Sequence, residues 1–250
     1  MIEPKGVSQI TMSEFDPKNF RILAVDDSDV VLKMVKTTLE RAGFEVLAAP
    51  SGEEALEQIQ QNGLPHLAIV DINMPLGMDG FEFCEAVLEF CDLPIIMLTA
   101  VEESDTIIQA IEQYAEDYIT KPVSTGELIA RVRRILRGLG KFAYPLEQFT
   151  RVDDHLAVNF ANCEAKVSGE ESVSLTPTET KLLYILMRSS GKLITTDFLL
   201  KRLWPLETAF EDRLRVYVHR LRNKIEQAPN DPKYIVSRRR KGYIFYPNGA

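Results

Sequence analysis

The sequence predicts a doubly wound α/β domain with a five-stranded parallel sheet, followed by a smaller α+β domain that begins with an antiparallel sheet. In the first half of the chain, short apolar runs alternate with helix-like segments. In the second half, short alternating stretches precede three helical patterns and a final strand–turn–strand. Charge also changes sign: residues 1–140 contain 11 Lys+Arg and 24 Asp+Glu, whereas residues 141–250 contain 18 and 13. Such segregation indicates two domains with different partners.

Five strand-like segments form the first domain. They lie at 21–25, 44–48, 66–71, 94–98 and 117–120. Each is followed by a segment with apolar residues at helical spacing. These helical segments lie at 28–41, 51–61, 80–90, 104–114 and 124–136. Because helices that join parallel strands cover both faces of the sheet, we expect a parallel sheet between two helical layers.

Four of these strands end in residues that can bind a metal ion or a phosphate. The residues are Asp26 and Asp27, Asp71, Thr99, and Lys121. The carboxyl ends of parallel strands are where ligands bind in open α/β sheets. Mg²⁺ prefers oxygen ligands, and a carboxylate can accept a phosphoryl group whose charge a metal ion and a cation neutralise. We therefore expect Asp71 to carry a phosphoryl group beside a Mg²⁺ ion, with Lys121 and Thr99 facing the phosphate.

These motifs resemble the receiver domain of response regulators, which has the fold of flavodoxin and CheY. The resemblance implies that Asp71 is the phosphoacceptor. It implies a metal site formed by Asp26, Asp27, Asp71 and Asn73. It implies phosphate-binding and switch residues at Thr99, Ala100, Tyr118 and Lys121, and a cis peptide bond at Lys121-Pro122. Family members dimerise through the fourth helix, fifth strand and fifth helix, where this chain has Glu116, Asp117, Glu127 and Arg131.

Two departures from the family pattern bear on this domain. Asp79-Gly80 follows Asp71 one residue later than usual, which predicts a one-residue insertion within 74–78. The usual basic partner of Glu127 is replaced by Ile107, so one interface ion pair is expected to be missing or rewired. Exposed ion pairs contribute about 0–1 kcal/mol each, so dimerisation can survive this loss.

The second domain carries a basic helix and a basic hairpin. Residues 147–175 predict a small antiparallel meander, and Thr176 with Glu179 predicts a capping box that starts a helix. A second helix is expected at 196–203, and a third from Arg213 to Gln227. Basic side chains on a helix and a hairpin suit DNA, because each one placed near a phosphate releases a condensed counterion. The candidate DNA contacts are Arg213, Arg215, Tyr217, His219, Arg220, Arg222, Lys224, Arg238, Arg239, Arg240 and Lys241.

This half resembles the winged-helix effector domain of OmpR/PhoB-type regulators. The matching stretches are Leu175-Thr176-Pro177-Thr178-Glu179, Leu203-Trp204, Leu221-Arg222-Asn223-Lys224-Ile225 and Gly242-Tyr243. The resemblance implies that the third helix enters the major groove and that the hairpin, called the wing, contacts the minor groove or the backbone. Arg215, Tyr217 and Arg240 depart from the common residues at their positions. The expected boundaries are an N-terminal extension at 1–19, a receiver domain at 20–138, a linker at 139–146 and an effector domain at 147–250.

The resulting hypothesis is a DNA-binding transcription regulator that a sensor histidine kinase phosphorylates and that forms a homodimer when phosphorylated. Double-stranded promoter DNA is an expected partner, and the loop from Pro205 to Asp212 makes RNA polymerase a candidate partner. The three cysteines show no close pairing, and the sequence has no signal-peptide pattern and no apolar run of membrane-spanning length. These features favour a cytoplasmic location without membrane association.

Two alternatives stay open at this point. The chain could be an atypical regulator that keeps the fold but works independently of phosphate. It could also be an aspartyl-phosphate phosphohydrolase of the haloacid-dehalogenase type. Those enzymes place a second Asp two residues after the nucleophile, and here that position holds Asn73. We therefore expect no enzyme activity.

Overall fold

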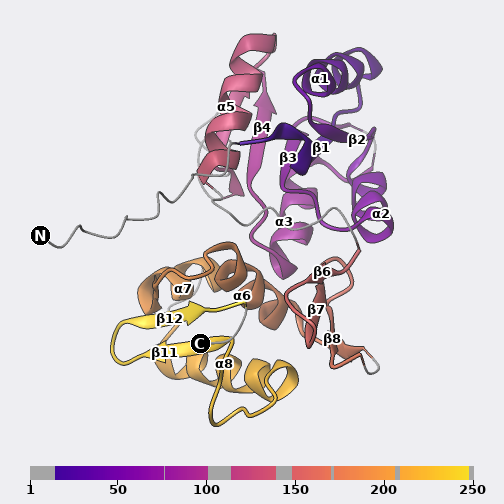
Figure 1. Cartoon of the computed structure of the whole chain (residues 1–250). Helices are drawn as coiled ribbons and strands as arrows, with labels where there is room; N and C mark the ends of the chain where they lie inside the picture. The colour runs from indigo at the N-terminus through magenta and orange to yellow at the C-terminus, as the bar shows by residue number, and fades with distance from the viewer. Residues whose placement is uncertain are drawn as a thin grey trace, which may run out of the picture.

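The structure, a computed structural model, describes residues 15–75, 77–100, 114–138, 148–169, 172–205 and 209–247. The chain folds into two domains, and Figure 1 shows the first domain above the second. No helix within these residues is long and apolar enough to cross a membrane.

The first domain is built on a parallel sheet of five strands. They are β1 (Arg21–Val25), β2 (Glu45–Ala49), β3 (Leu67–Asp71), β4 (Ile95–Thr99) and β5 (Asp117–Thr120). Their order in the sheet is β2-β1-β3-β4-β5, and all neighbours pair in parallel. The order reverses between β1 and β3, which is where ligands bind in sheets of this kind. Each predicted strand is confirmed to within one residue.

Helices cover both faces of this sheet. Those described are α1 (Asp29–Arg41), α2 (Gly52–Asn62), α3 (Gly80–Phe90) and α5 (Thr125–Gly138). Successive side chains of a strand point to opposite faces, so Ile22 packs in the cluster with α1 and α5, whereas Leu23 packs in the cluster with α2 and α3. The helix predicted at 104–114 lies outside the described residues, except for Tyr114.

The second domain begins with the predicted antiparallel meander, in the order β6-β7-β8-β9. Its strands are β6 (Thr150–Arg151), β7 (Leu156–Asn159), β8 (Glu164–Val167) and β9 (Val173–Ser174). The helices that follow are α6 (Pro177–Arg188), α7 (Thr196–Leu203) and α8 (Glu211–Ile225). A second sheet, in the order β10-β12-β11, contains β10 (Ile194–Thr195), β11 (Ile235–Arg238) and β12 (Gly242–Phe245).

Local side-chain bonds set the ends of α6 and α8. The predicted capping box is confirmed: the Thr176 hydroxyl accepts the Glu179 N–H at 3.3 Å, and the Glu179 carboxylate accepts the Thr176 N–H at 2.8 Å. Helix α8 ends two residues before the predicted Gln227. The carboxylate of Glu226 accepts the N–H of Ile235 at 2.8 Å, which turns the chain toward β11.

The two domains contact each other through α3 and α6. One cluster of buried apolar side chains extends through both domains, so the contact includes apolar packing. Helix α8 lies on the side of the second domain away from the first (Figure 1).

Candidate functional site

Three carboxylates lie together at the carboxyl end of the parallel sheet. One oxygen from each of Asp26, Asp27 and Asp71 lies within 4.8 Å of the others. The parallel pairing of Val25 with Val70 explains this, because the residues that follow the two strands meet at one edge. Asp26 and Asp71 are 2% and 4% exposed, and Asp27 is exposed. The hard oxygen donors of clustered acids fit a divalent cation such as Mg²⁺, which would relieve their mutual repulsion.

The lysine predicted at the end of β5 completes this acidic cluster. Lys121 Nζ lies 2.9 Å from Asp71 Oδ2 and 3.0 Å from Asp26 Oδ2. The peptide bond from Lys121 to Pro122 is cis, as predicted. Burial raises the pKa of the Asp71 carboxyl, and the opposing attraction of Lys121 does not cancel that effect. Burial alone would lower the pKa of Lys121, but the bonds to the two carboxylates outweigh it and leave that pKa raised.

The predicted switch residues Thr99 and Tyr118 lie on the neighbouring strands β4 and β5. The Thr99 side chain is buried, and its hydroxyl donates to the carbonyl of Ala100 at 3.0 Å. The Tyr118 ring is 47% exposed. Asn73 is exposed, and its backbone N–H bonds to the Asp71 carboxylate. The Thr99 hydroxyl therefore has a partner that it would have to leave in order to bond to a phosphoryl oxygen.

The loop between β3 and α3 is fastened to the start of α2, a contact that the sequence did not predict. The N–H of Met78 donates to Glu53 Oε1 at 2.7 Å. The Met78 side chain lies against Gly52, where an added Cβ would approach it to 2.7 Å. Gly77 has a φ of +80°, a conformation that favours glycine. One left-handed residue and one side-chain anchor thus shape the described part of this loop, and the predicted insertion stays a prediction.

The start of α3 presses on the backbone of Asp71. A Cβ added to Gly80 would lie 2.1 Å from the Asp71 carbonyl oxygen, so glycine is needed for this close approach. Just before it, Asp79 and Glu82 form a capping box with bonds of 2.9 and 3.0 Å. The start of α3 is therefore packed directly against the end of β3.

Three of the four residues predicted at a dimer interface form a network within the chain. Arg131 Nη1 lies 2.8 Å from Asp117 Oδ1, and Arg131 Nη2 lies 2.7 Å from Glu127 Oε1. Arg134, which the sequence analysis did not single out, also pairs with Asp117 at 2.7 Å. Burial would raise the pKa of Asp117, but the bond from Arg131 and its other hydrogen bonds outweigh burial and lower it.

The fourth residue, Glu116, faces the second domain. Its Oε1 lies 3.3 Å from Arg202 Nη2 and 3.8 Å from Arg188 Nη2. The sequence did not predict these contacts, because no local pattern shows which distant arginine lies opposite an acid. Glu116 and Asp117 are neighbours in the chain, yet they bind partners in different domains.

One side of α8 is open to solvent. Exposed side chains recur there at three- and four-residue spacing, which places them on one face of the helix. This open face consists of Asp212, Arg215, Val216, His219, Arg220 and Asn223. Asp212, Val216 and Asn223 were not among the predicted DNA contacts. Arg213 is also exposed, but its guanidinium lies over the Trp204 ring at 4.4 Å, and the ring of Tyr217 is 5.4 Å from that of Trp204.

Two other predicted DNA contacts on α8 turn toward the protein. Arg222 Nε donates to the carbonyl of Ile235 at 3.0 Å, and its Nη2 donates to the hydroxyl of Ser237 at 2.9 Å. Lys224 Nζ lies 2.7 Å from Glu179 Oε2. Arg222 thus fastens the first strand of the hairpin, and Lys224 fastens the start of α6.

The hairpin of β11 and β12 forms the predicted wing. Arg240 has a φ of +58°, in the left-handed region that favours glycine. Gly242 has a φ of +145°, and an added Cβ would lie 1.9 Å from the carbonyl oxygen of Ile194, so β12 approaches β10 closely. The exposed basic side chains at the tip are Arg238, Arg239, Arg240 and Lys241.

Comparisons with known proteins match both domains of the chain. The family model of the response regulator receiver domain matches residues 22–133. The model described as "Transcriptional regulatory protein, C terminal" matches residues 169–245. A relative, "Probable transcriptional regulator ycf27" of Galdieria sulphuraria, is 34% identical over 235 residues, which cover 90% of this chain and 89% of the relative. The chain is a response regulator of the OmpR/PhoB type.

Solved structures of response regulators are also similar to this one. The response regulator DrrB, an OmpR/PhoB homologue from Thermotoga maritima, is 26% identical, covers 91% of this chain and 99% of its own, and gives a TM-score of 0.43. A CheY-like receiver domain protein from Methanospirillum hungatei is 32% identical, covers 48% of this chain and 94% of its own, and gives a TM-score of 0.44. The two family models and the 34% identical relative show that the function class of this response regulator is transcription regulation in a two-component system.

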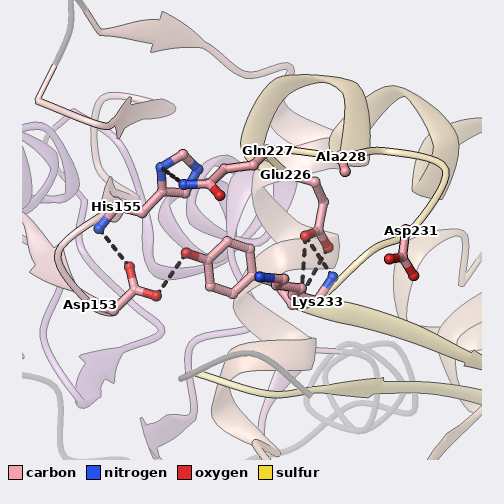
Figure 2. A pocket seen from close by; sticks show the side chains of 8 residues that line it. Asp153, His155, Glu226, Gln227, Ala228, Asp231 and Lys233 are labelled. Carbon is pink, nitrogen blue, oxygen red and sulfur yellow. Dashed lines mark hydrogen bonds between the residues drawn. The ribbon is translucent and has the colours of Figure 1, made fainter.

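A cavity of about 270 Å³ lies in the effector domain of this response regulator, apart from both sites. Figure 2 shows its lining. Asp153 accepts the N–H of His155 at 2.8 Å and the hydroxyl of Tyr234 at 2.7 Å. Glu226 accepts the N–H of Lys233 at 2.9 Å (Figure 2). Asp153 therefore joins the sheet of β6 to β9 to the chain that leads into β11. Glu226 joins the end of α8 to the same segment.

Proposed function

We propose that Asp71 accepts a phosphoryl group from a sensor histidine kinase and that the phosphorylated chain dimerises and binds promoter DNA. The observation that carries this proposal is the convergence of Asp26, Asp27 and Asp71, with Lys121 bonded to two of the three carboxylates. A carboxylate in such surroundings suits phosphoryl transfer, in which positioning and charge neutralisation do most of the catalysis.

In this reaction the P–N bond of a phosphohistidine breaks while an Asp71 oxygen forms the new P–O bond. Lys121 is placed to exchange its contact with the Asp71 carboxylate for one with a phosphoryl oxygen. Mg²⁺, held by Asp26, Asp27, Asp71 and the carbonyl of Asn73, would neutralise charge on the phosphoryl oxygens. The site residues themselves position the acceptor oxygen and supply the lysine cation.

The acyl phosphate would then act as a switch. Thr99 would leave the carbonyl of Ala100 for a phosphoryl oxygen, and the exposed Tyr118 ring would turn inward behind it. A change at Tyr118 alters β5, which also carries Asp117. We infer that this favours a homodimer through the face of Asp117, Glu127 and Arg131, as a shift between populated conformers.

The proposed output is DNA binding by α8 and the wing. The exposed positions of Arg215, His219 and Arg220 favour contacts with the major groove. Arg213 and Tyr217 lie at the edge of this open face. The wing residues, from Arg238 to Lys241, suit phosphates beside that groove. The loop from Pro205 to Asp212, of which 206–208 lie outside the described residues, is the proposed contact for RNA polymerase. A cytoplasmic location belongs to the same proposal.

The proposed domain boundaries follow the structure of the two halves. We assign residues 20–138 to the receiver domain and 147–250 to the effector domain, with an extension at 1–19 and a linker at 139–146. The linker and residues 1–14 lie outside the described residues. The first strand begins at Arg21 and the last helix of the receiver domain ends at Gly138, which supports these limits.

Phosphorylation can be tested with the purified chain, acetyl phosphate and Mg²⁺. We expect one phosphoryl group per chain by intact mass, and none on Asp71→Asn. Asp154→Asn is the matched control, because that exposed acid lies in the effector domain. Continued labelling of Asp71→Asn would contradict the assignment.

DNA binding needs its own measurement. The logarithm of the binding constant should fall with the logarithm of salt concentration by about 0.9 for each phosphate contacted. A flat salt dependence would count against α8 and the wing as the interface. Equal binding with and without the phosphoryl donor would instead favour the alternative of a phosphate-independent regulator.

A further inference from the structure

A cavity between α3 and the effector domain has a buried lysine in its wall. The cavity measures about 630 Å³ and is lined by residues of both domains. Lys181, on α6, is one of them and is only 8% exposed. Pro177 and Thr178 lie one helical turn before Lys181 and also line the cavity, so one face of the start of α6 forms this wall. Lysine is almost never buried to this extent unless it is paired.

Lys181 has no bonded partner in the part of the chain that the structure describes. Its ammonium forms no hydrogen bond and no ion pair with the described residues. Burial lowers the pKa of Lys181, and the longer-range attraction of the Asp92 carboxylate does not cancel that effect. An ammonium taken from water without a partner is costly. The N–H donors of Lys181 are therefore available to a negatively charged group that enters the cavity.

The acids nearest to Lys181 are already paired with arginines. Asp92 follows α3 and is 4% exposed. Its Oδ1 lies 3.0 Å from Arg202 Nε, and its Oδ2 lies 3.5 Å from Arg188 Nη1. Glu116 pairs with the same two arginines, at 3.3 and 3.8 Å. Two acids thus face three cations, and the charge of Lys181 is left without compensation.

The rest of the lining is neutral overall and partly apolar. Its other charged side chains cancel, two basic and two acidic: Lys201, Arg213, Glu85 and Glu89. Its larger aliphatic and indole side chains are Leu88, Leu93, Leu203 and Trp204. The cavity volume lies within the range of small-molecule sites, about 300–1,000 Å³. One uncompensated cation beside apolar walls suits a monoanion with an apolar body, whereas the carboxylates of Asp92 and Glu89 would repel a dianion.

We propose that this cavity binds a small organic carboxylate, with its carboxylate group paired to Lys181 and its apolar body against Leu203 and Trp204. The pair would be a charge-assisted hydrogen bond, which is stronger than a bond between neutral groups. Because both domains line the cavity, the bound carboxylate would contact the receiver and the effector at once. This inference goes beyond the proposed function, since it requires no phosphoryl group on Asp71.

The full chain can be titrated with cyclohexanecarboxylate as the probe. Ligand-detected NMR measures the affinity, and the fluorescence of Trp204, the one tryptophan of the chain, reports binding in this cavity. We expect saturable binding over the millimolar range with a change in Trp204 fluorescence. The neutral cyclohexanecarboxamide and the dianionic cyclohexyl phosphate should bind more weakly. The proposal is overturned if the carboxylate does not bind, if it binds without a change at Trp204, or if the amide or the phosphate binds equally well.

Variants then identify the cation that binds the carboxylate. Lys181→Met keeps the apolar stem and should weaken binding about tenfold or more, because a hydrogen bond to a charged group contributes that much. Lys201→Met removes an exposed charge from the same lining, and Lys192→Met removes one elsewhere in the effector domain, so both should bind like wild type. Equal loss in Lys181→Met and Lys201→Met would overturn the assignment. Asp71→Asn should bind the probe normally, so failure of the proposed function would leave this result intact. If Lys181→Met does not fold, the comparison of the probes on wild type still decides.

Discussion

The Lys121 ammonium lies 2.9 Å from the Asp71 carboxylate, so the proposed phosphoacceptor is ion-paired in the unmodified protein. This pairing does not remove the cost of burial, because the pKa of the Asp71 carboxyl stays above its usual value. At neutral pH the ionised acid is therefore held in surroundings less favourable than water. Added positive charge or loss of the negative charge should stabilise this part of the receiver domain.

Asp71→Asn should raise the free energy of unfolding at neutral pH in the absence of Mg²⁺. The folded-state pKa of Asp71 lies above the ordinary value of 3.8. The protonated Asp71 carboxyl therefore stabilises the folded state fully below the unfolded-state pKa. This stabilisation is lost as pH rises through the folded-state pKa and the carboxyl ionises. The advantage of the variant should shrink as pH falls toward about 4. Urea denaturation across this range measures it, and a variant less stable than wild type at neutral pH would contradict the assigned sign.

Mg²⁺ should stabilise the wild-type chain, and its removal with EDTA should reverse the effect. Binding to the folded state alone adds about 2.7 kcal/mol when the ion is at a hundred times its dissociation constant. Asp27→Ala should remove most of this gain while changing metal-free stability little, because Asp27 is exposed. Thermal denaturation with and without Mg²⁺ provides the comparison, with Asp154→Ala as the control. Equal gains in Asp27→Ala and wild type would exclude Asp27 as a ligand.

Gly80→Ala should destabilise the receiver domain and slow phosphorylation. An added Cβ would lie 2.1 Å from the Asp71 carbonyl oxygen, so the end of β3 or the start of α3 must shift. Overpacking of this kind costs about 1–3 kcal/mol or more. Gly126→Ala is a suitable control, since nothing lies within 4 Å of a Cβ added there. Denaturation and acetyl phosphate labelling should separate the two variants, and equal behaviour would show that the close approach is tolerated.

Glu53→Ala should release the loop that follows Asp71, whereas Glu53→Gln should retain it in part, because an amide oxygen can still accept the Met78 N–H. Hydrogen exchange of that amide measures the effect. Bonds from its own N–H and from Met78 lower the pKa of Glu53 below the usual 4.5. Protection should therefore be present above the usual pKa and be lost only as pH falls through the lowered value. Equal protection in wild type and Glu53→Ala would mean that Glu53 does not anchor the loop.

Arg222→Ala should mainly lower stability, whereas Arg220→Ala should mainly weaken DNA binding. Arg222 bonds to the carbonyl of Ile235 and the hydroxyl of Ser237, so its loss should cost about 1–3 kcal/mol of stability. Arg220 is exposed on the open face, so its loss should weaken DNA binding and reduce the salt slope by about 1 without altering stability. Denaturation and binding titrations of both variants check this. If Arg222→Ala keeps the stability of wild type but binds DNA more weakly, Arg222 is a DNA contact after all.

The parallel sheet and the convergence of the acidic cluster could be predicted from the sequence, because both depend on local patterns. Apolar runs define the strands, and the polar residues at the ends of four of them fix which side chains meet at the sheet edge. The capping box at Thr176 is local in the same way, since both of its partners lie within one helical turn.

Contacts between distant segments could not be predicted in this way. Arg222 and Arg220 are both basic residues on α8, and only the position of β11 decides that Arg222 turns inward. The partners of Glu116 depend on how two domains pack, which no spacing in the sequence encodes. The bond from Met78 to Glu53 depends on the path of a loop with a left-handed glycine, which composition alone does not specify.

The loop around Gly77 and the start of β5 should differ in how well they tolerate insertions and deletions during evolution. Among the described residues, Gly77 and Met78 belong to no strand, so an extra residue there leaves the neighbouring elements in register. At β5 the pairing of Ile96 with Asp117 fixes the register, and a one-residue slip sends every side chain to the opposite face. Aligned sequences of relatives should therefore show insertions before α3 and lack them at 116–118.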